Sequence, residues 1–100
     1  MEIKIACDNH VSVQNIELLR QFGYTIVFRA WNESDWEWCN KSLELGANVF
    51  ISCDWDIEFF CNKENVFCIR LPQNKAKKEQ LNYITKQLKK IKREANANSA

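Results

Sequence analysis

The sequence contains no apolar stretch near the ~18 uninterrupted residues that a membrane-spanning helix requires. It begins with a strand-like run, where a signal segment would be basic and then apolar. No repeat and no internal linker divides its 100 residues, of which 46% are hydrophobic. We therefore expect a single domain around one core, with no membrane segment and a cytoplasmic location.

Cysteine pairs with zinc-site spacing are also missing. The five cysteines form no CxxC pair, and their odd number precludes complete internal pairing. This pattern indicates neither a zinc site nor a disulfide framework, and we expect reduced, mostly buried thiols. The chain has one histidine, His10, which we expect in a turn beside the candidate site described below.

The charges that are present are unevenly distributed along the chain. Residues 1–74 carry six basic and eleven acidic side chains, a net charge of −5, whereas residues 75–93 carry eight basic and one acidic, a net charge of +7. The sequence therefore predicts an acidic body that bears a basic terminal helix.

Eight segments alternate between strand-like and helix-like patterns. Ser12 and Ser34 are in N-cap positions for the first two helices, and Gly23 and Gly46 follow their last turns. We expect residues 94–100 to form a frayed tail. The predicted strands cover residues 2–7, 24–28, 48–52 and 66–71, and the predicted helices cover residues 13–22, 34–45, 54–62 and 75–93.

This alternation predicts an α/β fold, a four-stranded parallel sheet with helices on both faces and right-handed crossovers. If the strand order is 2-1-3-4, the first and third strands are neighbours at the point where the order reverses, which is where such sheets bind ligands. The sequence therefore predicts a three-layer α/β/α domain over residues 1–93, with a binding crevice at the carboxyl edge of the sheet.

Aspartates follow three of the predicted strands. Asp8 ends the first strand, Asp35 opens the helix after the second, and Asp54 and Asp56 follow the third. Each alone has a structural explanation, as a turn former, a helix-dipole partner or a helix cap. Together they lie on the binding edge of one sheet, and carboxylates gathered without a cation repel one another. Hard oxygen ligands suit Mg²⁺ or Mn²⁺, so we expect a metal site for phosphodiester chemistry.

The chain resembles compact PIN-like nucleases over roughly residues 3–71. Residues 52–56 (SCDWD) follow a hydrophobic strand and are similar to the strand and Asp-x-Asp segment of that family, and residues 34–37 (SDWE) resemble its second-helix acidic element. Asp8 matches the first strand-end acid. The resemblance implies that Asp8, Asp35, Asp54 and Asp56 ligate Mg²⁺ or Mn²⁺ and form the catalytic site.

The same resemblance implies cleavage of single-stranded RNA or another nucleic acid, and short members of the family act as toxins paired with antitoxins. The chain departs from the family at Asn9, Cys53 and Trp55, where an acid and two basic residues are usual. A PIN-like module that binds without cleaving is therefore the alternative. A receiver-like signalling domain, with Asp54 as phosphoacceptor, is a third interpretation.

Exposed aromatic and basic side chains provide candidate contact residues. Trp36 and Trp55 lie beside the acidic elements and could stack on unpaired bases or anchor a protein partner. Lys77 and Lys78 open the basic helix, which could follow a phosphate backbone or bind an acidic antitoxin-like segment. A homodimer contact through the tryptophans is a further alternative.

Overall fold

The structure, a computed structural model, describes residues 1–99 and contains four strands and four helices in strict alternation. The element boundaries lie within about two residues of the predicted ones, except at the last helix. In chain order the elements are β1 (Lys4–Cys7), α1 (Val13–Gln21), β2 (Thr25–Arg29), α2 (Asp35–Glu44), β3 (Val49–Ser52), α3 (Trp55–Glu64), β4 (Phe67–Arg70) and α4 (Lys77–Ser99).

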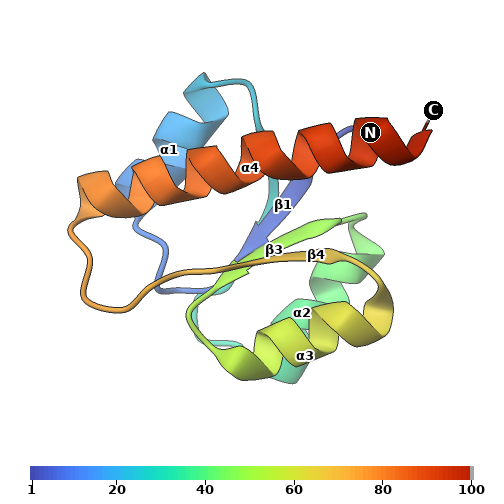
Figure 1. Cartoon of the computed structure of the whole chain (residues 1–100). Coiled ribbons are helices and arrows are strands. Elements are labelled where there is room, and N and C mark those ends of the chain that lie inside the picture. Colours follow the sequence, from blue (N-terminus) through green and yellow to red (C-terminus); the bar gives the residue numbers. More distant parts are fainter. Residues whose placement is uncertain (100) are drawn as a thin grey trace.

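The four strands form one parallel sheet in the order β2-β1-β3-β4. The predicted α/β class, strand order and three-layer arrangement are therefore confirmed. α1 and α4 cover one face of the sheet, and α2 and α3 cover the other (Figure 1). The register between β1 and β2 shifts between Ile5 and Ala6, a local irregularity that precedes the carboxyl edge.

Alternate residues of the central strands enter separate core clusters on the two faces, because successive strand side chains point in opposite directions. Ile5 and Cys7 of β1 pack with α1 and α4, whereas Ala6 packs with Phe50 and the helices α2 and α3. Burial on both faces explains why β3 is an unbroken apolar run followed by one buried serine.

The first two helices begin and end as their sequence signals predict. The hydroxyl of Ser12 accepts the Asn15 N–H at 3.1 Å, and the hydroxyl of Ser34 accepts the Glu37 N–H at 3.2 Å. The Glu37 carboxylate in turn accepts the Ser34 hydroxyl at 3.1 Å. Gly23 and Gly46 follow with φ of +95° and +86°, a conformation that glycine adopts without steric cost.

The last helix differs from the prediction. α4 begins at Lys77 and continues to Ser99, so residues 94–99 are helical where the sequence predicted a frayed tail; residue 100 lies outside the described residues. Ala95 is half-buried and shares a surface hollow with Asn65, Val66 and Phe67. The helix therefore continues past its apolar stripe, and Ala95 in this extension lies beside the turn before β4.

α4 packs against α1 through a polar contact as well as through its apolar stripe. The residues of this stripe, Ile84, Leu88 and Ile91, are buried in the core. The buried side chain of Asn15 donates from Nδ2 to the Lys77 carbonyl at 3.0 Å and to Gln80 Oε1 at 2.9 Å. Within residues 1–99, no helix has both the length and the apolarity needed to cross a membrane.

Candidate functional site

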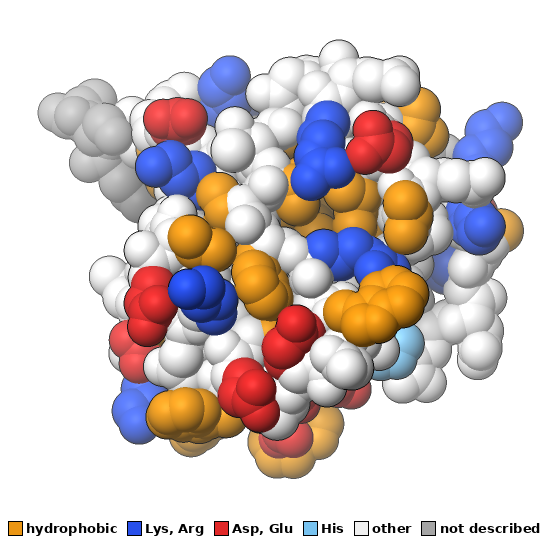
Figure 2. Space-filling model, turned by 180° about the vertical axis from the view of Figure 1, so that it is seen from behind, with side chains coloured by type: hydrophobic (Ala, Val, Ile, Leu, Met, Phe, Trp, Pro, Cys, Tyr) orange, Lys and Arg blue, Asp and Glu red, His pale blue; other side chains and the backbone are white. Residues whose placement is uncertain are grey.

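A pocket of about 220 Å³ lies at the carboxyl edge of the sheet, between the ends of β1, β2 and β3. Acidic side chains from three separate loops line it, together with two tryptophans. Figure 2 shows acidic and hydrophobic side chains interspersed over the lower half of one face, where α2 and α3 lie. The lining residues used below are Asp8, His10, Trp31, Glu33, Asp35 and Asp54.

Asp8 forms the floor of this pocket. It is 4% exposed, and its carboxylate accepts the Ser52 hydroxyl at 2.5 Å and the Cys53 N–H at 3.4 Å. Its other oxygen accepts the His10 N–H at 2.9 Å, the turn-forming bond expected of a strand-end aspartate. Asp8 is therefore held in one orientation by the end of β3 and by the turn that follows β1.

Ser52 connects Asp8 to the second acid. Its hydroxyl donates to Asp8 and accepts the Asp54 N–H at 3.1 Å. Asp54 is at the N-cap position of α3, yet its side chain makes no capping hydrogen bond. Among residues 1–99, the Asp54 carboxylate makes no hydrogen bond or ion pair, and it remains available at the pocket wall.

The loop after β2 contributes two further carboxylates. Asp35 accepts a hydrogen bond from the Trp38 indole N–H at 3.1 Å. Glu33 accepts the Trp31 backbone N–H at 2.7 Å. Hydrogen bonds from the backbone of Trp31, and of the residues after it, lower the pKa of the Glu33 carboxyl. Sequence reasoning missed Glu33, because only the conformation of the loop turns it toward the pocket.

The fourth predicted acid lies apart from the other three. Asp56 is exposed in the first turn of α3 and does not line the pocket. In the described part of the chain, no group of three Asp, Glu, His or Cys side chains is close enough to hold a metal ion as the side chains stand. The structure thus brings Asp8, Asp35 and Asp54 to one pocket, but their carboxylates are not close enough together to coordinate one ion.

The donors nevertheless fit Mg²⁺ or Mn²⁺ in kind. All three acids offer oxygen, and Asp54 has no competing partner within residues 1–99. Mg²⁺ keeps several water ligands and is commonly held through one or two carboxylates, so it does not require a preformed protein cage. Asp54 and Asp35 are the residues that would supply those carboxylates, beside a fixed Asp8.

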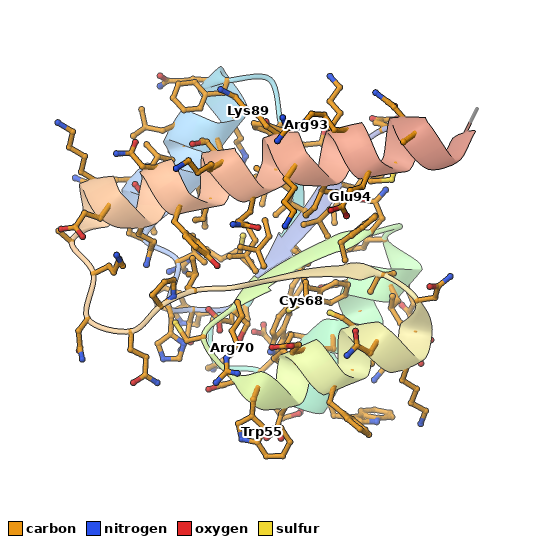
Figure 3. All side chains as sticks on the ribbon, in the orientation of Figure 1. Trp55, Cys68, Arg70, Lys89, Arg93 and Glu94 are labelled. Carbon is orange, nitrogen blue, oxygen red and sulfur yellow. The ribbon has the colours of Figure 1, made fainter. Side chains whose placement is uncertain are left out.

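None of the four predicted contact residues lines the acidic pocket. Trp36 and Trp55 are 76% and 64% exposed and do not line the pocket, and Trp55 points outward from the start of α3 (Figure 3). Trp38, two residues after Trp36, is 1% exposed, as the helical period requires. The tryptophans at the pocket itself are Trp38 and Trp31.

A second hollow of about 320 Å³ continues from the acidic pocket to the start of α4. His10 and Asp54 line both cavities, and Lys75 and Gln80 line the far wall of the second. Of the two lysines predicted as contacts, Lys77 donates to Gln14 Oε1 at 3.3 Å. The start of α4 therefore lies beside the acidic site. The lysine that lines the second hollow is Lys75, just before the helix, and neither Lys77 nor Lys78 lines it.

No cysteine among residues 1–99 lines the acidic pocket, although Cys53 bonds Asp8 through its backbone and lines the second hollow. All five are free thiols, and Cys7, Cys39 and Cys61 are buried, as predicted. Burial raises the pKa of Cys7 and of Cys39 to about 12. These two thiols are therefore neutral at physiological pH, which suits packing and not nucleophilic chemistry.

Comparison of the chain with family models, with curated proteins and with solved structures finds no match.

Proposed function

We propose that the acidic pocket binds Mg²⁺ or Mn²⁺ and that the protein is a PIN-like nuclease acting on single-stranded RNA. One observation carries the proposal: Asp8, Asp35 and Asp54, from three different strand-end loops, line the same pocket. The strand order β2-β1-β3-β4 supports it, because ligands bind where the order of such a sheet reverses.

Asp54 and Asp35, beside Asp8, would hold the divalent ion, which when bound would activate a water and neutralise charge at the scissile phosphate. The chain contributes orientation. Ser52 and the Cys53 N–H hold Asp8 so that it cannot rotate away, and Asp54 and Asp35 face the pocket from either side. His10 Nδ1 lies 3.3 Å from Asp8 Oδ2, so one ring nitrogen of this exposed side chain contacts the Asp8 carboxylate.

The test measures metal binding through thermal stability. A ligand that binds only the folded state at a hundredfold excess over its Kd adds about 2.7 kcal/mol. For a domain of this size, that addition raises the melting temperature by about 10 to 20 °C. Saturating Mn²⁺ should produce this rise in the wild-type protein, EDTA should reverse it, and Asp54→Asn should abolish it.

The controls separate the pocket from general acidity. Glu44→Gln removes an exposed carboxylate of α2 that pairs only weakly with Lys41 at 3.7 Å, and it should keep the Mn²⁺ response. Asp56→Asn decides whether the acid outside the pocket takes part in metal binding. A Mn²⁺ response that survives Asp54→Asn would end the metal proposal.

Activity is tested separately by incubating the protein with single-stranded RNA. Cleavage should require Mn²⁺ or Mg²⁺ and should disappear in both Asp8→Asn and Asp54→Asn. Asp54→Asn is the cleaner variant, because within residues 1–99 the Asp54 carboxylate makes no hydrogen bond or ion pair that the change would break. Metal binding without cleavage of any single-stranded RNA would contradict the nuclease proposal.

A noncatalytic module that binds a protein or nucleic acid is the second candidate. The observation that favours it is the presence of Asn9, Cys53 and Trp55 at positions where compact PIN-like proteins carry an acid or basic side chains. Trp36 and Trp55 would then contact an antitoxin-like partner or a second copy, with Lys77 and Lys78 pairing with acidic groups. A receiver-like domain has less support, since the sheet within residues 1–99 has no fifth strand.

A further inference from the structure

Trp31 lies at the mouth of the acidic pocket with most of its surface in solvent. It is 70% exposed, and it follows Ala30 directly after the end of β2. An exposed tryptophan leaves a large apolar surface in water, which is unfavourable in free energy. Neither the metal site nor the core accounts for this one.

The indole is held in place from two directions. The backbone N–H of Trp31 donates to Glu33 Oε2 at 2.7 Å, which fixes the turn that carries the ring. The guanidinium carbon of Arg29 lies 5.6 Å from the ring centroid, within the range of a cation–π contact. The ring therefore has a cation on one side, and its exposure leaves surface for a ligand.

Arg29 is itself only partly paired. Its terminal nitrogen donates to the Val11 carbonyl at 3.4 Å, while its buried Nε has no hydrogen-bond partner among the described residues. No carboxylate within residues 1–99 forms an ion pair with it. The Arg29 guanidinium therefore has spare hydrogen-bonding capacity beside Trp31, although acids line the adjacent pocket.

The surroundings of Trp31 favour a flat, polar-edged ligand over an apolar protein surface. Asn9, Asn32, Glu33 and Asp35 line the same pocket, so the indole is an apolar plane among hydrogen-bonding groups. A nucleobase has flat apolar faces and a polar edge, and the phosphate of its nucleotide could meet the Arg29 guanidinium. A protein anchor would instead require a contiguous apolar patch around the ring.

We infer that Trp31, backed by Arg29, is a stacking platform for an unpaired base, which orients a single strand so that its backbone enters the acidic pocket. This inference rests on the proposed function for the pocket, but it concerns a separate step, the binding of the base. Because a paired base does not expose its face within a duplex, the platform selects single-stranded nucleic acid.

The experiment measures binding without cleavage. Fluorescence anisotropy would follow a labelled single-stranded RNA of about 10 nucleotides, a suitable length for a small binding surface, in EDTA and again in Ca²⁺. Trp31→Ala should weaken binding about 5- to 150-fold, the equivalent of one lost base stack. Trp31→Phe should recover part of this loss, and an abasic oligonucleotide of equal length should bind both proteins equally weakly.

The matched control is Phe59→Ala, which removes an aromatic side chain of similar exposure outside the pocket and should leave affinity within twofold of wild type. Thermal melting verifies that each variant folds. Equal affinity of Trp31→Ala and wild type, equal losses on the abasic strand, or no RNA binding by the wild type would each overturn the inference. Retained RNA binding with selective capture of a protein through Trp31 would also overturn it.

The outcomes separate this inference from the proposed function. If Asp54→Asn abolishes cleavage while Trp31→Ala binds RNA normally, the platform fails and the nuclease proposal stands. If no cleavage occurs but Trp31→Ala loses RNA affinity selectively, the platform stands and the nuclease proposal fails.

Discussion

Ser52 is the residue on which the geometry of the acidic pocket depends most directly. Its buried hydroxyl makes two hydrogen bonds, donating to Asp8 at 2.5 Å and accepting from the Asp54 backbone at 3.1 Å. Hydrogen bonds to charged groups are roughly twice as strong as neutral ones. A single side chain thus fixes the carboxylate of β1 against the start of α3.

Ser52→Ala should lower the free energy of unfolding by about 2 to 3 kcal/mol, because it removes a buried bond to a carboxylate. Urea denaturation measures this change. The matched control is Ser42→Ala, which removes an equally buried hydroxyl that donates to the Trp38 carbonyl at 2.6 Å, a neutral acceptor inside α2. It should cost about 1 kcal/mol or less. Equal losses in the two variants would show that Asp8 does not depend on Ser52.

Among the elements, α4 has a role beyond covering the sheet. Its N-terminal end brings Lys75 and Gln80 beside the acidic site, and the buried Asn15 of α1 holds that end in place. Lys89 and Arg93 lie one turn apart farther along the same helix (Figure 3). The two hydrogen bonds of Asn15 and the apolar stripe of α4 therefore hold the basic helix in its orientation relative to the pocket.

Asn15→Ala should cost about 1 to 3 kcal/mol of stability, since it leaves the Gln80 side chain and one carbonyl lone pair of Lys77 without this buried donor. Hydrogen exchange in the first turns of α4 should accelerate, as the helix end loses its attachment. Gln14→Ala is the matched control, because it removes an exposed side chain that contacts Lys77 at 3.3 Å. It should change stability by at most about 0.5 kcal/mol. Similar exchange rates in both variants would contradict a specific role for Asn15.

At the scale of the whole molecule, a buried thiol lies in the core on each side of the sheet. Cys7 of β1 packs against α1 and α4, and Cys39 of α2 packs in the cluster between α2, α3 and the sheet. Burial raises the pKa of each from 9.0 to about 12, and Asp8 and Asp35 respectively add to the shift. Both core clusters therefore resist ionisation of a thiol.

The stability of the protein should fall as the pH rises from 9 to about 12. Above pH 9 the unfolded chain releases thiol protons that the folded chain retains, so each thiol lowers the unfolding free energy by up to about 1.4 kcal/mol per pH unit. Below pH 9 both states keep the proton, and the stabilising contribution is fully present. Urea denaturation across this range measures the slope.

Cys7→Ala should reduce this alkaline slope, whatever its cost in core packing. Val11→Ala, at a fully buried position of the same core cluster, removes apolar volume without removing a titratable group and should keep the wild-type slope. Parallel pH curves for wild type and Cys7→Ala would show that this thiol does not contribute.

Local sequence patterns determined the elements and their order. Ser12 and Ser34 begin helices because their hydroxyls satisfy free backbone N–H groups, and Gly23 and Gly46 end them because glycine tolerates positive φ. Strict alternation of strands and helices then requires a parallel sheet, and the carboxyl ends of parallel strands lie on one edge. Asp8, Asp35 and Asp54 could be assigned to one pocket for this reason alone.

Tertiary structure decided which side chains complete the pocket. Trp31 and Glu33 reach the pocket because the loop after β2 meets the loops that follow β1 and β3, and no local pattern predicts this meeting. Asp56 lies outside the pocket, although two residues away Asp54 lines it. The last helix also continues past residue 93 to Ser99, and Ala95 in this extension is half-buried. Periodicity and capping act between near neighbours in the chain, whereas these placements depend on residues that meet only after folding.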